Sequence, residues 1–449
     1  MSTAVWWVRR DIRLQDNGAL VSAAAHGDVV PLFVWEDNLL ASAGDTRRAF
    51  LFEALDGLDD SAGCALIYRD GPAVEAVPEF CRLVGADTVH ITEDFAPWGR
   101  ARDAEVEKAL AGAGITLVRA DTPYVIRPGT VRKDDGTPLK VFTPFYKRWL
   151  THSWSSFGDA KVTFADHRDL CVGSRRPADR QAAPARPAGE AGAWERFDGW
   201  SARAMDRYKD DRNNPALDGT SMMSPYLKFG VVHPRQLLAR LDASPGAEHF
   251  RSEIAWREFY ADVLFHQPRT AWENLQPKMD AMRLDTDSAA RGRFEVFCRG
   301  ETGYPIVDAG IRQMLATGWM HNRVRMIVAS FLVKDLHLPW QWGARFFMEQ
   351  LVDADIASNN HGWQWTAGTG TDAAPYFRVF NPVSQGQKFD PEGEYVRAWV
   401  RELDGVDKKH VHEPWTLGLL APAGYPAPMV DHSVEREEAL LRYKQVSGQ

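Results

Sequence analysis

The chain has 449 residues, which is longer than one hydrophobic core usually supports, so two or three domains are expected. Hydrophobic residues make up 45% and charged residues 25%, as in soluble globular proteins, and no apolar run reaches the roughly 18 residues that span a bilayer. The net charge of −8 offers no general attraction to a polyanion, so a nucleic acid would need a local cluster of Lys and Arg.

The first 125 residues alternate between two sequence patterns. Runs rich in β-branched and aromatic residues predict buried strands at residues 4–10, 29–35, 64–70, 87–93 and 115–121. Apolar residues at helical spacing predict helices between them, at residues 45–60, 73–86 and 99–114. This alternation predicts an α/β domain over residues 1–130 with a Rossmann-like, doubly wound parallel sheet. A dinucleotide-binding domain is not indicated, because no GxGxxG follows the first strand.

The rest of the chain divides into a linker and a helical region. Residues 131–200 are predicted to be an interdomain linker, because SRRPADRQAAPARPAGEAGA (174–193) is rich in Pro, Ala and Gly and has no apolar period. Over residues 201–449 strand signals nearly vanish. Helical periods occur at residues 233–243, 250–267, 305–318, 322–336 and 342–358. They predict a mostly α-helical domain, which can hold a large cofactor between facing helices.

Cysteines, histidines and the N-terminus bear on metals and location. The four cysteines form no CxxC pair and the 13 histidines show no metal-ligand spacing, so a protein without a metal is expected. The N-terminal MSTAVWWVRRDIRL turns charged too early for a secretory signal. We therefore expect a cytoplasmic protein without a membrane segment.

Two short motifs combine polar and aromatic residues in a way that suits a planar, charged ligand. In SEIAWREFY, Glu253, Trp256 and Arg257 share a helix face, which favours stacking on and hydrogen bonding to a heterocycle over a solvated ion pair. The turn GTSMMS (219–224) suits phosphate binding, although on its own a helix cap is the more common explanation.

Two further stretches gather charged and indole groups. TGWMHNRVRM places basic residues beside aromatic ones, as nucleic-acid surfaces do, but a charged helix start is also common. DADIASNNHGWQW (353–365) contains two carboxylates with too few further oxygen ligands for a metal site. Its asparagines and tryptophans favour a site for a hydrogen-bonded heterocycle.

These motifs occur in an order that resembles the photolyase/cryptochrome family. The resemblance covers nearly the whole chain, from Val5 to about Leu441, and is carried by WWVRRDIRLQDNGAL, GTSMMSPYLKFG, AWREFY, TGYPIVDAGIRQMLATGWMHNRVRM and NNHGWQWTAGTGTDAAPYFRVFNP. It is closest to the family's class I enzymes for cyclobutane pyrimidine dimers. The resemblance implies a monomeric FAD protein that repairs UV-damaged DNA with light. The alternative is a cryptochrome-like blue-light photoreceptor that binds FAD without repair.

The resemblance implies two groups of FAD-binding residues. The phosphates and sugars would contact Tyr208, Thr220, Ser221, Met222, Met223 and Ser224. The flavin ring would be lined by Asn322, Arg325, Asp353, Asp355 and Asn359, with Arg325 and Asp353 paired. A nearby cation and hydrogen-bond donors suit an anionic reduced flavin. Asn359 matches the position facing the flavin N5, where photolyases carry Asn and plant cryptochromes typically carry Asp, so it favours repair.

The implied substrate is a pyrimidine dimer flipped out of the DNA duplex. Glu253 and Trp256 match the residues that hydrogen-bond to and stack on the dimer, and Trp365 matches the second aromatic wall. Met326 matches the methionine of cyclobutane-dimer enzymes, whereas (6-4) enzymes carry His there. The further candidates for DNA contacts are Asn322, Arg212, Arg257 and Arg323.

The implied chemistry is electron transfer from excited, reduced FAD to the dimer. The catalytic candidates are Glu253, Asn359, Trp363 and Trp340. Trp363 and Trp340 also match the first two tryptophans of the family's photoreduction relay, but the third position is Phe297, which is much harder to oxidise. Trp342, Trp319 or a tyrosine could serve as the third electron donor in its place. We expect impaired photoreduction of oxidised FAD relative to a three-tryptophan relative.

The resemblance does not assign the role of His361 or the identity of the antenna pigment. His361 stands where the family's repair enzymes often have glycine. EDFAPWGRARD (93–103) lies where family members bind a light-harvesting pigment, and it looks closer to the deazaflavin-binding pattern than to the folate-binding one. We expect 8-hydroxy-5-deazaflavin, with no antenna, methenyltetrahydrofolate or a second flavin as alternatives. The expected contacts are Arg48, Asp94 and Lys228.

Overall fold

The computed structural model describes residues 2–171, 186–371 and 378–447. Most of the linker motif, residues 174–185, and residues 372–377 of the last family motif lie outside this part. The chain forms two compact units, which are described in turn: unit 1 is Met1–Ala202 with Ser221–Pro268, and unit 2 is Arg203–Thr220 with Arg269–Gln449. Within the described ranges, no helix is long and apolar enough to cross a membrane.

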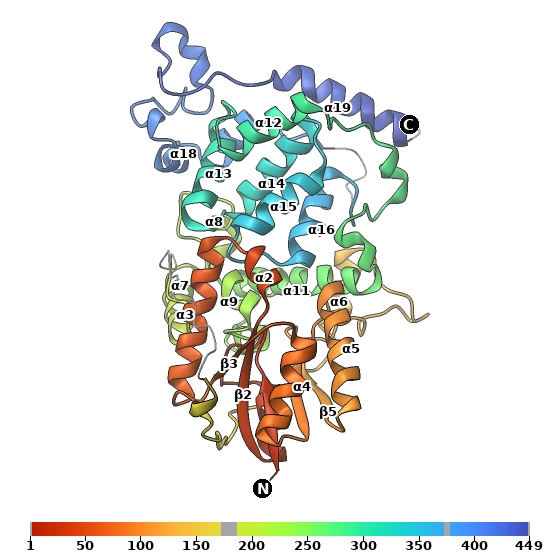
Figure 1. Ribbon diagram of the computed structural model, residues 1–449. Coiled ribbons are helices and arrows are strands. Elements are labelled where there is room, and N and C mark those ends of the chain that lie inside the picture. The colour runs from red at the N-terminus through yellow and green to blue at the C-terminus, as the bar shows by residue number, and fades with distance from the viewer. Residues whose placement is uncertain (1, 172–185, 372–377, 448–449) are drawn as a thin grey trace. The chain divides into compact units, whose positions relative to one another are not determined.

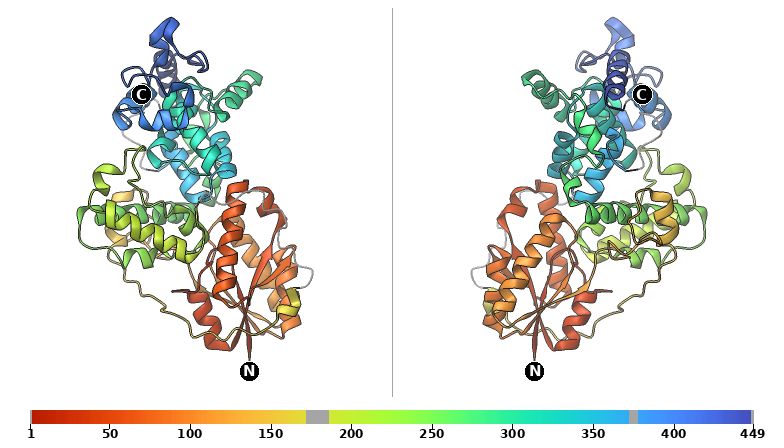
Figure 2. Two further views of the ribbon diagram at one scale, coloured as in Figure 1. Left: turned by 90° about the vertical axis from the view of Figure 1, so that its left-hand side faces the viewer. Right: turned by 90° about the vertical axis from the view of Figure 1, so that its right-hand side faces the viewer.

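Unit 1 begins with a five-stranded parallel sheet in the order β3-β2-β1-β4-β5, with helices on both sides (Figures 1 and 2). The strands are β1 (Thr3–Trp7), β2 (Asp28–Trp35), β3 (Ile67–Asp70), β4 (Thr88–Thr92) and β5 (Thr116–Asp121). Because both faces are covered, the central strands are almost continuously apolar. Val5 lies opposite Val30 and Val89 in the register, and all three are fully buried. The predicted doubly wound α/β fold is confirmed.

The helices of unit 1 extend well beyond the predicted α/β segment. They are α1 (Gly18–His26), α2 (Asp37–Ala41), α3 (Asp45–Ser61), α4 (Ala73–Val84), α5 (Pro97–Gly112), α6 (Phe142–Trp149), most of α7 (Glu190–Ala204), α9 (Ser224–Phe229), α10 (Pro234–Leu238) and α11 (Pro245–His266). Residues 131–200, predicted to be a linker, therefore contain α6 and most of α7. Helix α6 lies before the Pro-rich stretch 174–193, and α7 begins near its end.

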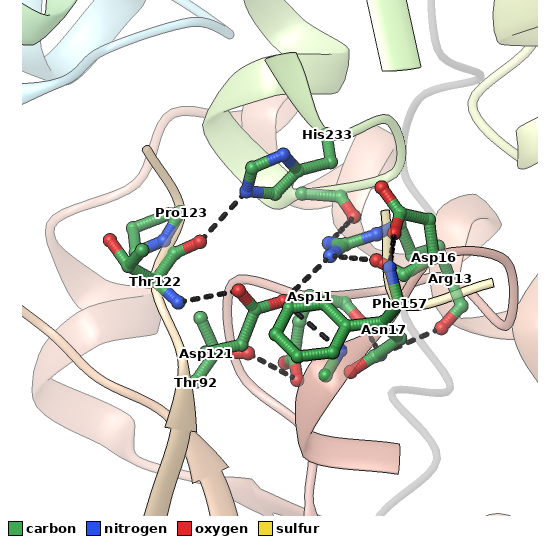
Figure 3. A network of polar contacts seen from close by, with 12 residues as sticks. Asp11, Arg13, Asp16, Asn17, Thr92, Asp121, Thr122, Pro123, Phe157 and His233 are labelled. Carbon is green, nitrogen blue, oxygen red and sulfur yellow. Dashed lines mark hydrogen bonds and ion pairs between the residues drawn. The ribbon is translucent and has the colours of Figure 1, made fainter. Parts of the chain in front are cut away.

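A buried polar network holds α10 in unit 1 (Figure 3). Arg235 of α10 donates to Asp16 at 2.6 Å and to both oxygens of Asp121 at 2.9 and 3.1 Å. Arg13 donates to the same Asp121 at 3.3 Å. His233, the N-cap of α10, hydrogen-bonds through Nε2 to a carbonyl in the turn after β5 at 2.8 Å. These contacts fix α10 to the end of β5.

Unit 2 contains helices and no strands in its described residues, which confirms the predicted mostly helical second half. Its elements are α8 (Tyr208–Asp211), α12 (Ser288–Cys298), α13 (Pro305–Thr317), α14 (Asn322–Ser330), the π-helical turn Phe331–Asp335, α15 (Trp340–Gln350), α16 (Ile356–Ala367), α17 (Pro382–Phe389), α18 (Glu394–Trp399) and α19 (His432–Ser447). The stretch 342–358, predicted as one helix, is split between α15 and α16. It breaks because Asp355 is the N-cap of α16 and accepts from the N–H groups of Ala357 and Ser358.

Candidate functional site

One face of α11 carries two predicted substrate residues, and α6 orients one of them. Glu253 and Trp256 lie one turn apart and are partly exposed. The Trp256 indole stacks on Phe142 of α6, with ring centroids 3.7 Å apart and ring planes inclined by 9°. Phe142 thus covers one face of the indole and fixes its orientation. No pattern in the sequence points to Phe142, because it is far from α11 along the chain.

Arg257, predicted to contact DNA, is engaged within unit 1. Its guanidinium donates to the carbonyls of Pro123 at 2.9 Å and Leu227 at 3.2 Å, and it lies 4.5 Å from the centre of the Tyr124 ring. The neighbouring Glu258 accepts two backbone N–H groups from the segment after β5, and burial raises the pKa of its carboxyl to about 7. Arg257 therefore helps to fix α11 to the sheet.

The predicted phosphate-binding turn has an unusual backbone. Met222 has a φ of 54°, a left-handed conformation that is uncommon for a residue with a Cβ atom. The hydroxyl of Ser221 accepts from the Met223 N–H at 3.3 Å, and its carbonyl accepts from Arg196 at 3.1 Å. Strained turns that are held in place in this way are common at ligand sites. Unit 1 contains Ser221, Met222, Met223 and Ser224, and unit 2 contains Tyr208 and Thr220.

Unit 2 brings together the residues predicted to line the flavin ring. Arg325 of α14 donates to both oxygens of Asp353 at 3.2 and 2.8 Å. Asn359 of α16 donates from Nδ2 to a carbonyl of α15 at 3.0 Å, which sets the orientation of its amide. Helices α14 and α16 pack against each other. Asp355 serves as the α16 cap, and Asn322 is exposed at the start of α14.

Two buried donors, one at the N-cap of α14 and one in α16, fit a ligand with hydrogen-bond acceptors, such as a flavin. His321 caps α14 by accepting the Arg323 N–H at Nδ1 (3.1 Å), so Nε2 carries the proton and has no partner among the described residues. The indole Nε1 of Trp363 is also buried and has no hydrogen-bond partner in the described part of the chain. An unsatisfied buried donor costs about 1–3 kcal/mol, which a bound acceptor would offset.

The remaining predicted DNA contacts lie in unit 2. Arg323 donates from Nε and Nη2 to the side-chain oxygen of Asn213, at 3.1 and 2.6 Å. The Arg212 guanidinium lies 5.5 Å from the centre of the Tyr208 ring. Two predicted substrate residues are partly exposed, namely Met326 and Trp365. The structure thus leaves the aromatic and thioether groups accessible, while Arg323 already has a partner.

The two tryptophans predicted to begin the photoreduction relay lie on adjoining helices. A Cβ atom at Gly343 of α15 would be 2.1 Å from Cη2 of Trp363, so this indole touches the α15 backbone. Trp363 also makes an edge contact with Phe347, with ring centroids 4.9 Å apart. Trp340, one turn before Gly343, is buried and donates to the side chain of Asn274 at 2.9 Å. Trp363 therefore contacts the helix that carries Trp340.

Phe297, at the position predicted to be third in the relay, lies in a phenylalanine cluster. Phe297 is fully buried, and its ring is 6.1 Å from that of Phe294. Trp342 is partly exposed and contacts Phe294 at 5.4 Å, but the Arg291 guanidinium lies only 3.8 Å from its ring centre. Trp319, the other proposed substitute, is buried.

His361 has a structural role in α16. It is fully buried, and Nδ1 is 2.8 Å from a carbonyl one turn earlier, so Nδ1 carries the proton. Its Nε2 therefore accepts from the hydroxyl of Thr270 at 3.0 Å. Asn360 and Gln364 donate to carbonyls of the same stretch, at 2.5 and 2.9 Å. Helix α16 thus holds residues 270–275, called the 270–275 segment below.

The stabilisation that His361 provides is expected to disappear in acid. Burial lowers the pKa of His361 from 6.5 to about 4. Between these pH values the unfolded chain binds more protons than the folded one, so stability falls as the pH falls, by up to roughly 3 kcal/mol. Urea denaturation of the protein and of His361→Gln should show a difference that is full above pH 6.5 and largely lost by pH 4. A difference that stays constant over this range would contradict the assignment.

Of the predicted antenna residues, Asp94 follows the carboxyl end of β4, Arg48 lies in α3 and Lys228 lies in α9. Asp94 is 3.8 Å from both Arg10 and Arg102, and although burial opposes ionisation, these arginines lower the pKa of its carboxyl. Arg10 also donates to the carbonyl of Lys228 at 3.3 Å. Arg48 instead pairs with an aspartate one turn earlier in α3. Asp94 and Lys228 are thus connected through Arg10, whereas Arg48 has a partner of its own.

Family models and a curated relative match this chain along most of its length. Residues 4–162 match the model described as DNA photolyase, and residues 250–445 match the FAD binding domain of DNA photolyase. The deoxyribodipyrimidine photo-lyase of Vibrio cholerae is 38% identical, and the match covers 98% of this chain and 99% of the relative.

Solved structures share the fold. A bacterial class III photolyase from Agrobacterium tumefaciens has a TM-score of 0.89 at 35% identity, covering 100% of this chain and 98% of its own. A cryptochrome from Synechocystis has a TM-score of 0.87 at 25% identity, covering 98% of each chain. The similarity therefore includes both a photolyase and a cryptochrome.

Proposed function

The chain belongs to the photolyase/cryptochrome family, and we propose that it repairs cyclobutane pyrimidine dimers in DNA by light-driven electron transfer. The observation that supports repair most directly is the α11 face. Phe142 covers one side of Trp256, one turn from the carboxyl group of Glu253. An indole held in this way suits stacking on an extrahelical base, and the carboxyl group suits its polar edge.

The residues of the described site would divide the work around a flavin. FAD, when bound and reduced, supplies the electron that light excites. Arg325, oriented by Asp353, stabilises negative charge on the ring. Asn359, whose amide is oriented by its bond to α15, would interact with the ring edge. The turn at residues 221–224 binds the phosphates. Glu253 and Trp256 bind the dimer.

Repair is tested directly with reduced, FAD-loaded protein and an oligonucleotide that contains one thymine dimer. Blue light is expected to restore the two thymines, and samples kept in the dark should not change. Protein that retains FAD but restores no thymines in the light would support the cryptochrome-like photoreceptor instead.

Dimer binding is expected to depend on the indole of Trp256. Trp256→Ala should weaken binding of the dimer-containing oligonucleotide about 5- to 150-fold at fixed salt, because stacking on an aromatic side chain contributes about 1–3 kcal/mol per base. Fluorescence anisotropy measures the affinity. Trp194→Ala removes an indole of α7 that stacks under Arg240, and it should bind the dimer as the unsubstituted protein does. Equal affinities for both variants would argue against this role of Trp256.

For the antenna we propose 8-hydroxy-5-deazaflavin at the carboxyl end of β4. Ligands of doubly wound sheets bind at this edge, and Asp94 and Lys228 are connected there through Arg10. Protein produced in cells that synthesise the deazaflavin should carry an absorption band beyond those of FAD, and Asp94→Ala should lose that band. The band of a folate, of a second flavin, or of FAD alone would contradict the deazaflavin.

A further inference from the structure

Trp272 lies at the surface beside the second relay tryptophan. Its side chain is 61% exposed, more than that of any other tryptophan in the part of the chain that the structure describes. The Trp272 carbonyl accepts from the side chain of Gln341 at 3.3 Å, and Asn274 accepts from the Trp340 indole at 2.9 Å. Because residues 340 and 341 are neighbours at the start of α15, both bonds hold the chain at residues 272–274 against the part of α15 that carries Trp340.

The 270–275 segment that carries Trp272 is fixed to the helix that carries Trp363. His361 bonds to the Thr270 hydroxyl at 3.0 Å. Gln364 binds both ends of the segment, donating to the Thr270 carbonyl at 2.9 Å and accepting from the Leu275 N–H at 2.8 Å. The segments that carry Trp363, Trp340 and Trp272 are therefore joined by hydrogen bonds within unit 2.

The other possible exits are less suited to losing an electron. Phe297 has no readily oxidised ring. Trp342 would develop positive charge 3.8 Å from the guanidinium of Arg291, which coulombic repulsion opposes. Trp319 is buried, so water would not stabilise a charge on its ring. The exposed ring of Trp272 is in water, which both stabilises positive charge and accepts the indole proton.

We propose that Trp272 is the surface electron donor for photoreduction of the bound FAD, in the place that Phe297 leaves without a tryptophan. This rests on the proposed function, because it requires FAD beside Trp363. One electron passes from Trp363 to the flavin. Trp340 then gives one electron to Trp363, and Trp272 gives one electron to Trp340. Trp272 then releases its Nε1 proton to water and is left as a neutral radical. A soluble thiol returns one electron, and water returns the proton. With this exit, photoreduction does not need a tryptophan at position 297.

The test measures photoreduction of oxidised, FAD-loaded protein under blue light with dithiothreitol as the reductant. Trp272→Phe is expected to slow the loss of the oxidised-flavin absorption about tenfold or more, whereas Trp342→Phe should stay within about twofold of the unsubstituted protein. A Trp272→Phe rate within about twofold of the unsubstituted rate would overturn the proposal. Slowing by Trp342→Phe alone would also overturn it and would assign the exit to Trp342.

Transient absorption separates a redox role from a structural one. The unsubstituted protein should show a long-lived neutral tryptophan radical whose decay accelerates with added thiol, since the radical is exposed. Trp272→Phe should lack this thiol-sensitive radical while binding the same amount of FAD. A thiol-sensitive radical that persists in Trp272→Phe would refute the assignment. Repair is assayed separately with chemically reduced FAD, so a failure of repair would affect the proposed function and not this result.

Discussion

Arg235→Met is expected to lower the free energy of unfolding of unit 1 by about 3–5 kcal/mol. Arg235 is buried and donates to Asp16 and Asp121, which are also buried. Methionine is unbranched and apolar like the stem of arginine, so the substitution mainly removes the charge and its hydrogen bonds. It leaves Asp16 and Asp121 without their main cation in a site from which water is excluded. Losing one partner of a buried ion pair is costly because the remaining charge stays desolvated.

The comparison that isolates this effect is an exposed arginine of the same unit. Arg240 pairs with Asp198 at 2.7 Å, and both side chains are about half exposed. Arg240→Met should cost no more than about 1 kcal/mol, because water screens and replaces such a pair. Urea denaturation, together with hydrogen exchange of the β1 and β5 amides, reports on unit 1. Equal losses for the two variants would mean that the network in Figure 3 contributes little.

The parallel sheet could be predicted because its signal is local. Each strand is a short apolar run, and the helices between strands have their own period, so no knowledge of distant contacts was needed. The extent of unit 1 could not be predicted in this way. Asp121 and Arg235 are isolated charges in the sequence, and only the fold shows that they pair. The same holds for α6, whose apolar face is explained by its contact with α11.

The candidate site also contains residues that a sequence motif predicts and residues that only the fold reveals. Motif residues such as Arg325, Asp353 and Asn359 could be named as candidates from the sequence, and the structure places them on adjoining elements. Their supporting contacts could not be assigned, because Phe142 and Trp272 belong to no motif and act through segments distant in sequence. His361 differs from both cases. It stands at a motif position where the family's repair enzymes often have glycine, but only its bond to Thr270 shows that it supports the 270–275 segment.

Gly343→Ala is expected to destabilise unit 2 by about 1–3 kcal/mol and to slow photoreduction, although it places alanine in a helix. Helix propensity alone predicts the opposite, a gain of about 1 kcal/mol for replacing glycine within a helix. The new Cβ would lie 2.1 Å from Cη2 and 2.6 Å from Cζ3 of the buried Trp363, so either the indole or the α15 backbone must move. Movement of Trp363 alters its distances to Trp340 and to a flavin, and electron transfer is steeply sensitive to distance.

Gly292→Ala provides the matched control, because it tests the same substitution in a helix of unit 2 where space is available. Gly292 lies inside α12, and a Cβ there meets nothing within 4 Å. This variant should be stabilised by up to about 1 kcal/mol and should keep its photoreduction rate. Opposite signs for the two variants in urea denaturation would show that the contact with Trp363 decides the outcome. If Gly343→Ala were also stabilised and photoreduced normally, Trp363 would have room to move without consequence, and close packing on α15 would not be what positions the relay.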